Sequence, residues 1–431
     1  MQKIRLQLFA ANTTENNTSG NDLSPEMKTY YEKRLIDLAE PRLVHDQFGD
    51  KYPIPQGSGK SIEFRKYDSL AKASTPISEG VTPTGNSLNV SAVTETVMQY
   101  GDWIQLSDML EMSAVDNNVL QATRLLGAQA GRTLDTITRD VLAGGTNVIY
   151  APTWSGSTPT EVTSRIDLDA TSRLTADLVF RAAAQLKGMN ADPIDDQYVA
   201  IIHPYVAYDL MRCDEWIDAH KYASPENLYT GEIGKLAGVR FVESSEAKIF
   251  RGADILATSR TLTVSAYNGS NTGISISHGV TSSYLVTVSE TLDTDHAKAL
   301  VGTYLSITDT SAGVSEKIKV VGVHTTNKYL YLEAAPSFTP VSGDVIHPAG
   351  GGMGDISVFA TIVLGAHAYA VTELEGGGLT HIVKQLGYGD DPLNQRSSVG
   401  WKATKCARRL VEQYMVRIES ASTYALNAAA N

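Results

Sequence analysis

Cysteine is scarce in this sequence, which has only Cys213 and Cys406 among its 431 residues. Two thiols cannot form a disulfide framework, so we expect a reducing compartment or indifference to redox state. Long apolar runs are also absent. No stretch approaches the roughly 18 apolar residues of a membrane span, and the run at residues 6–11 is too short for a secretory signal. We therefore expect no membrane partner.

Clustered positive charge is a second absence. The chain has 36 basic and 48 acidic residues, which gives a net charge of −12, and no basic run exceeds two residues. Attraction to nucleic acid phosphates needs a concentrated positive patch. If DNA is a partner, the composition favours DNA that is enclosed by the protein over DNA that is gripped by it.

Catalytic motifs are missing as well, because neither a His-Glu-x-x-His nor a Gly-x-Ser-x-Gly pattern occurs. The string GSGKS at residues 57–61 matches the end of a phosphate-binding loop. However, the full pattern needs a glycine where Ile54 stands and a helix afterwards. Residues 62–67 alternate like a strand instead, which favours a flexible entry to a hairpin over a nucleotide site.

The candidate metal ligands do not form a convincing set. Cys213 and His220 are seven residues apart and could share a helix face near His203, yet a zinc site usually has paired ligands at tight spacing. The acidic groups do not have the spacing of ligands that a calcium-binding loop requires. These groups are Asp167/Asp169, Asp192/Asp195/Asp196 and Asp293/Asp295. We predict no catalytic, cofactor-binding or metal-binding residues.

Two patterns dominate the first third of the chain. Between residues 107 and 143, apolar side chains recur every three or four positions, which predicts one helix roughly 55 Å long at ~1.5 Å per residue. Upstream, residues 52–100 alternate and indicate a long two-stranded hairpin, with Ile62 and Phe64 on one strand and Val90 on the other. Such a ribbon is at best marginally stable alone. A rod with a protruding arm therefore suggests a part that packs against copies of itself.

The remaining chain mixes helices and strands. We expect helices at 24–38 and 176–187 and at a stretch through Trp216, a buried strand at 198–202 and a further strand at 239–242. This mixed part of the chain resumes at 356–364 and ends in a helical or strand-like segment at 401–418. Between 253 and 352, Thr, Ser, Gly and Val dominate, with short β-like runs and one candidate helix near 296–300. This composition predicts a separate β domain inserted in a loop, with Gly350-Gly351-Gly352 as an exit hinge.

Three segments carry a resemblance to a known family. The strings DPLNQRSSVGWK at 391–402, LQLFA at 6–10 and GEIGKLAGVRFVES at 231–244 closely resemble one branch of the major capsid proteins of tailed phages. The likeness extends over nearly the whole chain except the β-rich insert. It implies an α+β Hong Kong 97-like capsid fold.

The resemblance implies the following layout. Residues 1–51 would be an N-terminal arm with a short helix, and 52–104 an extended β-hairpin loop. Residues 105–197 would be a peripheral domain with a spine helix at 107–143. The axial domain would comprise 198–252 and 353–385 around an inserted all-β domain at 253–352, and 386–431 would return to the peripheral domain.

The implied function is a non-enzymatic virion protein that self-assembles into pentamers and hexamers of an icosahedral head around double-stranded DNA. The implied partners are further copies, a separate scaffolding protein, a portal and a decoration protein, with assembly in the bacterial cytoplasm. Some relatives join a loop lysine covalently to a neighbour's asparagine. Lys60, Lys66 and Lys72 lie in the corresponding region, and nothing else in the sequence indicates this link.

Two alternatives remain open. A phage tail or surface protein with a receptor-binding β domain would form trimers or tubes. A nucleotide-binding enzyme that uses residues 57–61, the less favoured alternative, would lose nucleotide binding in Lys60→Ala.

Overall fold

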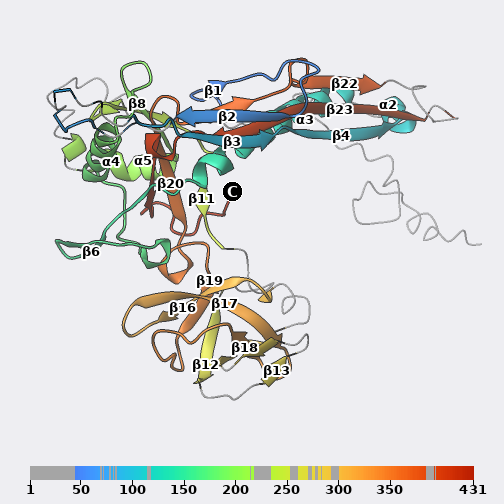
Figure 1. Cartoon of the computed structure of the whole chain (residues 1–431). Helices are drawn as coiled ribbons and strands as arrows, with labels where there is room; N and C mark the ends of the chain where they lie inside the picture. Colours follow the sequence, from blue (N-terminus) through green and yellow to red (C-terminus); the bar gives the residue numbers. More distant parts are fainter. Residues whose placement is uncertain are drawn as a thin grey trace, which may run out of the picture.

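The computed structural model describes residues 44–67, 70, 72–76, 79–80, 82, 85–113, 118–213, 215–217, 234–252, 261–269, 274–276, 280–282, 284–292, 300–384, 393 and 395–431. This part of the chain contains three main bodies: an elongated five-stranded sheet, a central seven-stranded sheet and a closed barrel (Figure 1). The helices predicted at 24–38 and near 296–299, and His220, lie outside the described residues.

The elongated sheet is organised around one long strand, β23 (Arg396–Arg409). On one side β23 pairs antiparallel with β4 (Met98–Ser107). On the other side it pairs with β22 (Thr380–Lys384) and β21 (Tyr369–Thr372), and β1 (Asp50–Lys51) adds to β21. The predicted segment 401–418 is therefore extended, and its second part is strand β24 (Met415–Ser420), reached through a short 3-10 turn at Glu412–Tyr414.

Helix α3 (Asn118–Ala143) lies along the elongated sheet and partly fulfils the predicted rod. Its predicted apolar stripe is buried at Ala122, Leu126 and Ala130, and the last two pack with Val399 and Trp401 of β23. The expected single helix from 107 to 143 is wrong. Ser107 pairs with Arg396 in the sheet, and its hydroxyl accepts a hydrogen bond from the Leu110 amide, so it caps a separate short helix, α2 (Asp108–Ser113).

Two arginines satisfy the carboxyl end of α3. Arg409 of β23 donates to the Val141 carbonyl, and Arg417 donates to the carbonyls of Ala143 and Gly145. The last carbonyls of a helix lack partners within the helix and carry its negative dipole end. The arginines therefore fix where α3 ends, and they tie it to both sheets.

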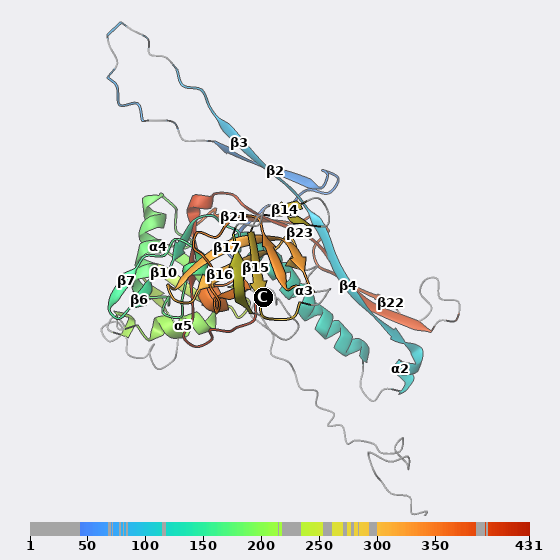
Figure 2. The same cartoon turned by 90° about the horizontal axis from the view of Figure 1, so that it is seen from below.

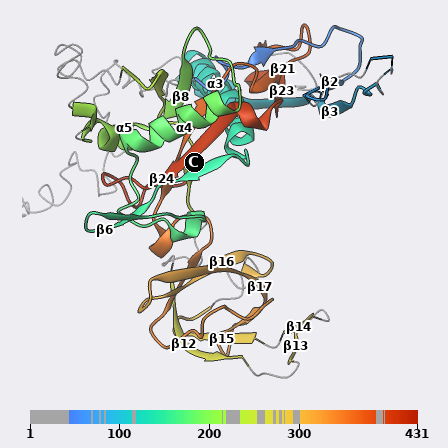
Figure 3. The same ribbon diagram turned by 60° about the vertical axis from the view of Figure 1, so that its left-hand side comes forward.

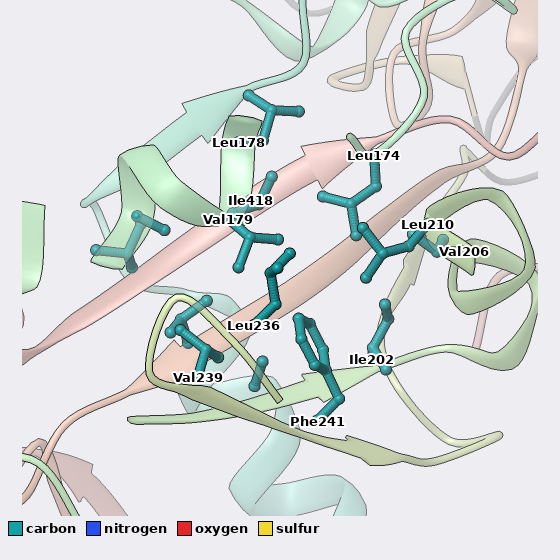
Figure 4. Close-up of a cluster of buried hydrophobic side chains, with 14 of the residues drawn as sticks. Leu174, Leu178, Val179, Ile202, Val206, Leu210, Leu236, Val239, Phe241 and Ile418 are labelled. Carbon is teal, nitrogen blue, oxygen red and sulfur yellow. The ribbon is translucent and has the colours of Figure 1, made fainter. Parts of the chain in front are cut away.

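The central sheet has the strand order β5 (Val148–Tyr150), β24 (Met415–Ser420), β20 (Val358–Leu364), β8 (Tyr198–Ile202), β10 (Val239–Glu243) and β9 (Lys235–Leu236), with β11 (Ile249–Phe250) paired to β20. Helices α4 (Ala176–Gly188) and α5 (Pro204–Met211) pack on one face (Figure 4). The end of α3 packs on the other through Leu142. Burial on both faces explains the continuous apolar run of β8.

The two sheets draw on segments that cross the domain boundaries expected from the sequence. Strand β5 and helix α4, expected in a peripheral domain with residues 105–197, belong to the central core with β8. Strand β24 also belongs to the central sheet, although residues 386–431 were expected to return to the peripheral domain. Conversely, β22 joins the elongated sheet rather than the axial part at 353–385. Strand pairing between distant segments leaves no composition change at such a boundary.

A charged cluster is buried beside the central sheet. The Glu419 side chain is fully buried and accepts hydrogen bonds from Nε of Arg165 at 2.6 Å and from Nε of Arg417 at 2.8 Å. Arg165, in the 3-10 turn Arg165–Asp167, also stacks over the Phe250 ring at 3.5 Å. Burial lowers the pKa of Arg417, and the Glu419 carboxylate opposes that shift. The cluster joins β24, β11 and the end of α3.

The third body is a closed antiparallel barrel below the sheets (Figures 1 and 3). Its strands are β12 (Leu262–Asn268), β15 (Tyr284–Val288), β18 (Tyr329–Leu332), β17 (Val314–His324), β16 (Tyr304–Asp309) and β19 (Val345–Pro348). A small hairpin, β13 (Ile274–Ile276) and β14 (Val280–Ser282), follows β12. The barrel has its own apolar core, which includes Leu262, Val286 and Leu330. These residues lie within the predicted insert at 253–352.

The connection between barrel and central sheet is tightly packed at its glycines. A Cβ atom on Gly350 would lie 2.4 Å from the Gly252 nitrogen, one on Gly351 would lie 2.3 Å from the Ile356 oxygen, and one on Gly352 would lie 2.4 Å from the Leu168 oxygen. These glycines permit close backbone approach. The exit hinge predicted at residues 350–352 is therefore closely packed against Gly252, Ile356 and Leu168 and is not a flexible linker.

Candidate assembly surfaces

The first candidate surface is the hairpin of β2 (Ser61–Tyr67) and β3 (Val90–Thr96), which confirms the predicted ribbon. The two strands pair antiparallel from Ser61↔Thr96 to Tyr67↔Val90. Figure 2 shows the hairpin leaving the body of the molecule, so no further strand of the described chain covers it.

Among the described residues of the hairpin, those at its base pack against the rest of the molecule. There Ile62 contacts a small cluster of Ile54, Val97 and Cys406, and the rings of Tyr52 and Phe64 meet edge to face at 5.6 Å. Burial raises the pKa of the Cys406 thiol to about 11. The base of the hairpin is thus buried against the rest of the molecule.

Beyond its base the hairpin is exposed. Tyr67 is 64% exposed and its cross-strand partner Val90 is 49% exposed. Arg65 pairs with Glu63 on the same strand at 2.8 Å, which raises the pKa of the arginine. The ribbon therefore presents an apolar pair and a charged pair on one face, and neither contacts another part of the described chain.

The second candidate surface lies at the far end of the elongated sheet, and we call it the tip surface. Exposed apolar side chains occur on β4, α2, α3 and β22, whose ends lie at this end of the elongated sheet (Figure 2). Trp103 is 61% exposed and Met112 is 72% exposed. The other members are Met109, Leu110, Leu120, Leu125, Leu379, Ile382, Val383 and Leu393.

Hydrogen bonds between β23, α3 and β4 hold together the elements that carry the tip surface. Trp401 donates its indole N–H to Gln129 of α3 at 3.3 Å, and Gln129 donates to Asp102 of β4 at 2.6 Å. This hydrogen bond, together with that from the Trp103 amide, lowers the pKa of Asp102. A groove of about 380 Å³ runs between Trp103, Ile382 and Trp401. Large exposed apolar patches on a folded protein mark sites of association.

The segment that precedes the hairpin is fixed to α3 by buried polar contacts. The amide and ring Nδ1–H of His45 both donate to Asp135, at 2.8 and 2.7 Å. Asp46 accepts from Thr138 and pairs with Lys405. Burial lowers the pKa of Lys405, and the nearby Asp46 opposes that shift. Sequence reasoning missed these contacts, because single polar residues in a helix give no signal of a distant partner.

The residues considered for chemistry are dispersed. The glycines at 57 and 59 lead directly into β2, so no helix follows to hold a phosphate. His203 caps α5, where its Nδ1 accepts the Tyr205 amide at 3.2 Å, and Cys213 interacts with the carbonyl of Asp209. Asp169 accepts from Thr171 and Ser172 within its own turn. Asp293 and Asp295 lie outside the described residues.

The described residues show neither a clustered metal-ligand set nor a membrane-spanning helix. No three His, Cys, Asp or Glu side chains come together there as a metal site would require. In the same residues, no helix is both long and apolar enough to cross a membrane.

Comparison with known proteins identifies the architecture. Among solved structures, the capsid of cyanophage P-SCSP1u superposes with a TM-score of 0.53, covering 95% of this chain and 97% of that chain at 14% identity. The chain has a phage capsid protein fold. The capsid of Ralstonia phage GP4 (TM-score 0.52, 12% identity, 95% and 98% covered) and the cyanophage Pam1 capsid (0.51, 11%, 92% and 98%) share this capsid fold.

The sequence comparison agrees with the capsid fold. A family model described as phage capsid protein matches residues 104–289, from the end of β4 through β15 of the barrel. No curated protein sequence matches the chain. The α+β capsid fold predicted from the sequence is therefore confirmed.

Proposed function

We propose that this protein is the major capsid subunit of a tailed phage, whose copies form the pentamers and hexamers of an icosahedral head around double-stranded DNA. The observation that carries the proposal is the hairpin of β2 and β3. It leaves the body and packs against it at its base, although a two-stranded ribbon is marginal in water without further cover. A neighbouring copy supplies that cover in an assembled shell.

The tip surface gives each subunit a second contact region. The hairpin and the tip surface lie at different ends of the elongated sheet. One subunit can therefore contact a neighbour with its hairpin while its tip surface is contacted by a different neighbour. Heterologous contacts of this kind close into rings when the rotation between copies allows it. Obligate interfaces commonly exceed about 2,000 Å² in total, an area that two separate regions reach more readily than one.

Exposed groups on α3 provide a surface for the arriving hairpin. Leu120, Arg124 and Leu125 are exposed on the side of α3 that faces away from β23. The hairpin offers the matching kinds of group in Tyr67, Val90 and Glu63. We assign residues 52–97 as the extended loop that crosses a neighbour, because 98–104 of the predicted loop 52–104 belong to β4 of the elongated sheet. We assign α3 as the spine that receives it.

The remaining assignments follow the same proposal. The protein acts structurally and not as an enzyme, and assembly takes place in the bacterial cytoplasm with a separate scaffolding protein, a portal and a decoration protein. The net charge of −12 suits DNA that is enclosed without being held, because tight phosphate binding needs clustered positive charge. The central sheet forms the axial region and the barrel the inserted domain.

Co-expression with the proposed scaffolding protein tests this function. The products would be separated on sucrose gradients, and the subunit rings would be weighed by native mass spectrometry. We expect closed shells together with pentamers or hexamers. Trimers or open tubes from the same expression would favour a tail or surface protein, and persistent monomers with nucleotide turnover lost in Lys60→Ala would favour an enzyme.

A further inference from the structure

The segment after β24, residues 421–431, follows a fixed path over the central sheet and ends beside the barrel connection. Its first residues are held by the helices. Ala421 donates its amide to the Ser172 carbonyl, Ser422 donates its hydroxyl to the Tyr205 carbonyl at 2.9 Å, and the Thr423 amide donates to the buried Asp209 carboxylate at 2.9 Å. This part of the segment belongs firmly to the central body.

Tyr424 anchors the next step. Its ring lies 5.0 Å from the ring of Tyr205 and 5.6 Å from that of Tyr208, both on α5. Aromatic pairs at such spacing contribute about 0.5–1.5 kcal/mol beyond area burial. From this anchor the chain turns toward β11 and the connection to the barrel (Figure 1).

Residues 426–431 then contact both segments that lead to the barrel. On the returning segment, Ser357 donates its amide to the Leu426 carbonyl at 2.8 Å and its hydroxyl to the Ala428 carbonyl at 2.6 Å. On the outgoing segment, the Ile249 amide donates to the Asn431 side chain at 2.9 Å, and Asn431 donates back to the Ala247 carbonyl at 2.8 Å. The tail therefore bridges the two segments.

Arg251 completes the bridge. Its guanidinium pairs with Asp355 on the returning segment at 3.1 Å and donates to the Asn427 carbonyl of the tail at 2.8 Å. Both ionic side chains are largely buried. A forked guanidinium can serve two acceptors at once, which a lysine ammonium cannot do in the same geometry. One side chain thus joins the outgoing segment, the returning segment and the tail.

We propose that residues 424–431 are a strap that fixes the orientation of the barrel relative to the central sheet. The barrel has its own core and is connected to the body by two chain segments, and its strand β17 also lies against the 3-10 turn Arg165–Asp167. The contacts that the two segments make therefore contribute to the orientation of the barrel. The strap supplies contacts to both, and Arg251 links them. Because every strap contact is made within one chain, the proposal is independent of the capsid function.

The test measures barrel orientation in the whole chain. Spin labels would be attached to cysteines placed at the exposed positions Ala184 on α4 and Thr326 on the barrel, after replacement of Cys213 and Cys406 by alanine. Double electron–electron resonance then gives the distance distribution between barrel and body. We expect one narrow peak in the complete chain, and loss of that peak after removal of residues 425–431.

Hydrogen exchange identifies the contacts responsible. The amides of Ile249 and Ser357 donate hydrogen bonds to the strap. Removal of residues 425–431 should therefore abolish their protection from hydrogen exchange. The Ala360 amide, which donates to Lys248 within the body, should remain protected and serves as the internal control. A distance peak that stays narrow in the shortened chain overturns the proposal.

A full-length variant guards against a shortened chain that does not fold. Arg251→Lys keeps the positive charge but cannot serve Asp355 and the Asn427 carbonyl together. We expect it to broaden the distance distribution, and Lys319→Met, which removes an exposed ion pair on the barrel, to leave it narrow. A distribution for Arg251→Lys as narrow as that of the parent chain also overturns the strap.

Discussion

Replacing Val90 with aspartate should block shell assembly without harming the isolated subunit. Val90 is 49% exposed on β3 and lies opposite Tyr67, which is 64% exposed. In the subunit alone, the new carboxylate would be solvated at a position that already faces water. Surface changes away from special features usually alter stability by no more than about 0.5 kcal/mol.

The effect on assembly can be worked from the exposed fraction. Full burial of a valine side chain contributes about 1.5 kcal/mol, so covering the exposed half contributes about 0.8 kcal/mol that the aspartate loses. Covering an unpaired carboxylate costs several kcal/mol more, even after relaxation. Together the two terms exceed about 3 kcal/mol per contact, which lowers the association constant by more than roughly 100-fold. Repeated over every subunit, that loss should prevent closed shells.

The assay compares two matched variants. Val301 on the barrel is 47% exposed, so Val301→Asp makes the same chemical change at nearly the same exposure away from the hairpin. Sedimentation after co-expression with the scaffold should show shells for Val301→Asp and free subunits for Val90→Asp, with equal thermal midpoints for both subunits. Wild-type shell yield from Val90→Asp would refute the claim that this face of the hairpin is covered in the assembly.

Three further predictions concern the subunit itself. Glu419→Gln should lower the free energy of unfolding by about 3–5 kcal/mol, because it leaves Arg165 and Arg417 without their buried carboxylate; urea titration should show little change for the exposed Glu333→Gln. Gly350→Ala should lower the free energy of unfolding by several kcal/mol, because the new Cβ would lie 2.4 Å from the Gly252 nitrogen. Gly127→Ala, whose Cβ would have no atom within 4 Å, should raise the free energy of unfolding by up to about 1 kcal/mol. Burial lowers the pKa of His203 to about 4, so its contribution to stability is complete above about pH 6.5 and lost as the pH falls toward 4.

The pH prediction has its own control and magnitude. The unfolded histidine binds a proton at about pH 6.5, and the folded one does not until about pH 4, so protons favour unfolding between these values. The difference corresponds to about 3 kcal/mol at ~1.4 kcal/mol per pH unit. His203→Asn keeps an acceptor for the Tyr205 amide at the helix cap. Its stability should change less between pH 7 and pH 5 than that of the wild type; an equal change in both would contradict the argument.

Local sequence patterns were sufficient for the elements whose burial follows a simple period. The run at 198–202 is a strand buried on both faces, and the alternation from Ile62 gives a hairpin strand. Turn residues and composition separated the barrel from its surroundings, because a small all-β body needs many short strands and tight turns. The capsid fold itself was reached through the resemblance of residues 391–402 and 231–244, and not through periodicity.

The failures have a common physical cause, which is non-local pairing. Ser107 continues an apolar rhythm that suits a helix, yet its partner Arg396 lies in a strand almost 300 residues later and keeps it extended. The glycines at 350–352 looked like a hinge because glycine is flexible in isolation. The structure uses their missing Cβ atoms for close packing against Gly252, Ile356 and Leu168.

The candidate surfaces were only partly accessible to sequence reasoning. The hairpin could be recognised as a ribbon without a core, which led to a neighbouring copy as its support. The tip surface could not be predicted, because Trp103 and Met112 are typical core residues in a sequence and only the fold leaves them exposed. The contacts of residues 424–431 were equally hidden, since backbone carbonyls accept most of them.

The most direct measurement is a cryo-electron microscopy reconstruction of the particles formed with the scaffolding protein. The account predicts a closed icosahedral shell in which β2 and β3 of each subunit lie across a neighbouring copy, with Val90 and Tyr67 covered. A particle without icosahedral symmetry, or a shell in which the hairpin stays in solvent or contacts only its own subunit, would contradict it.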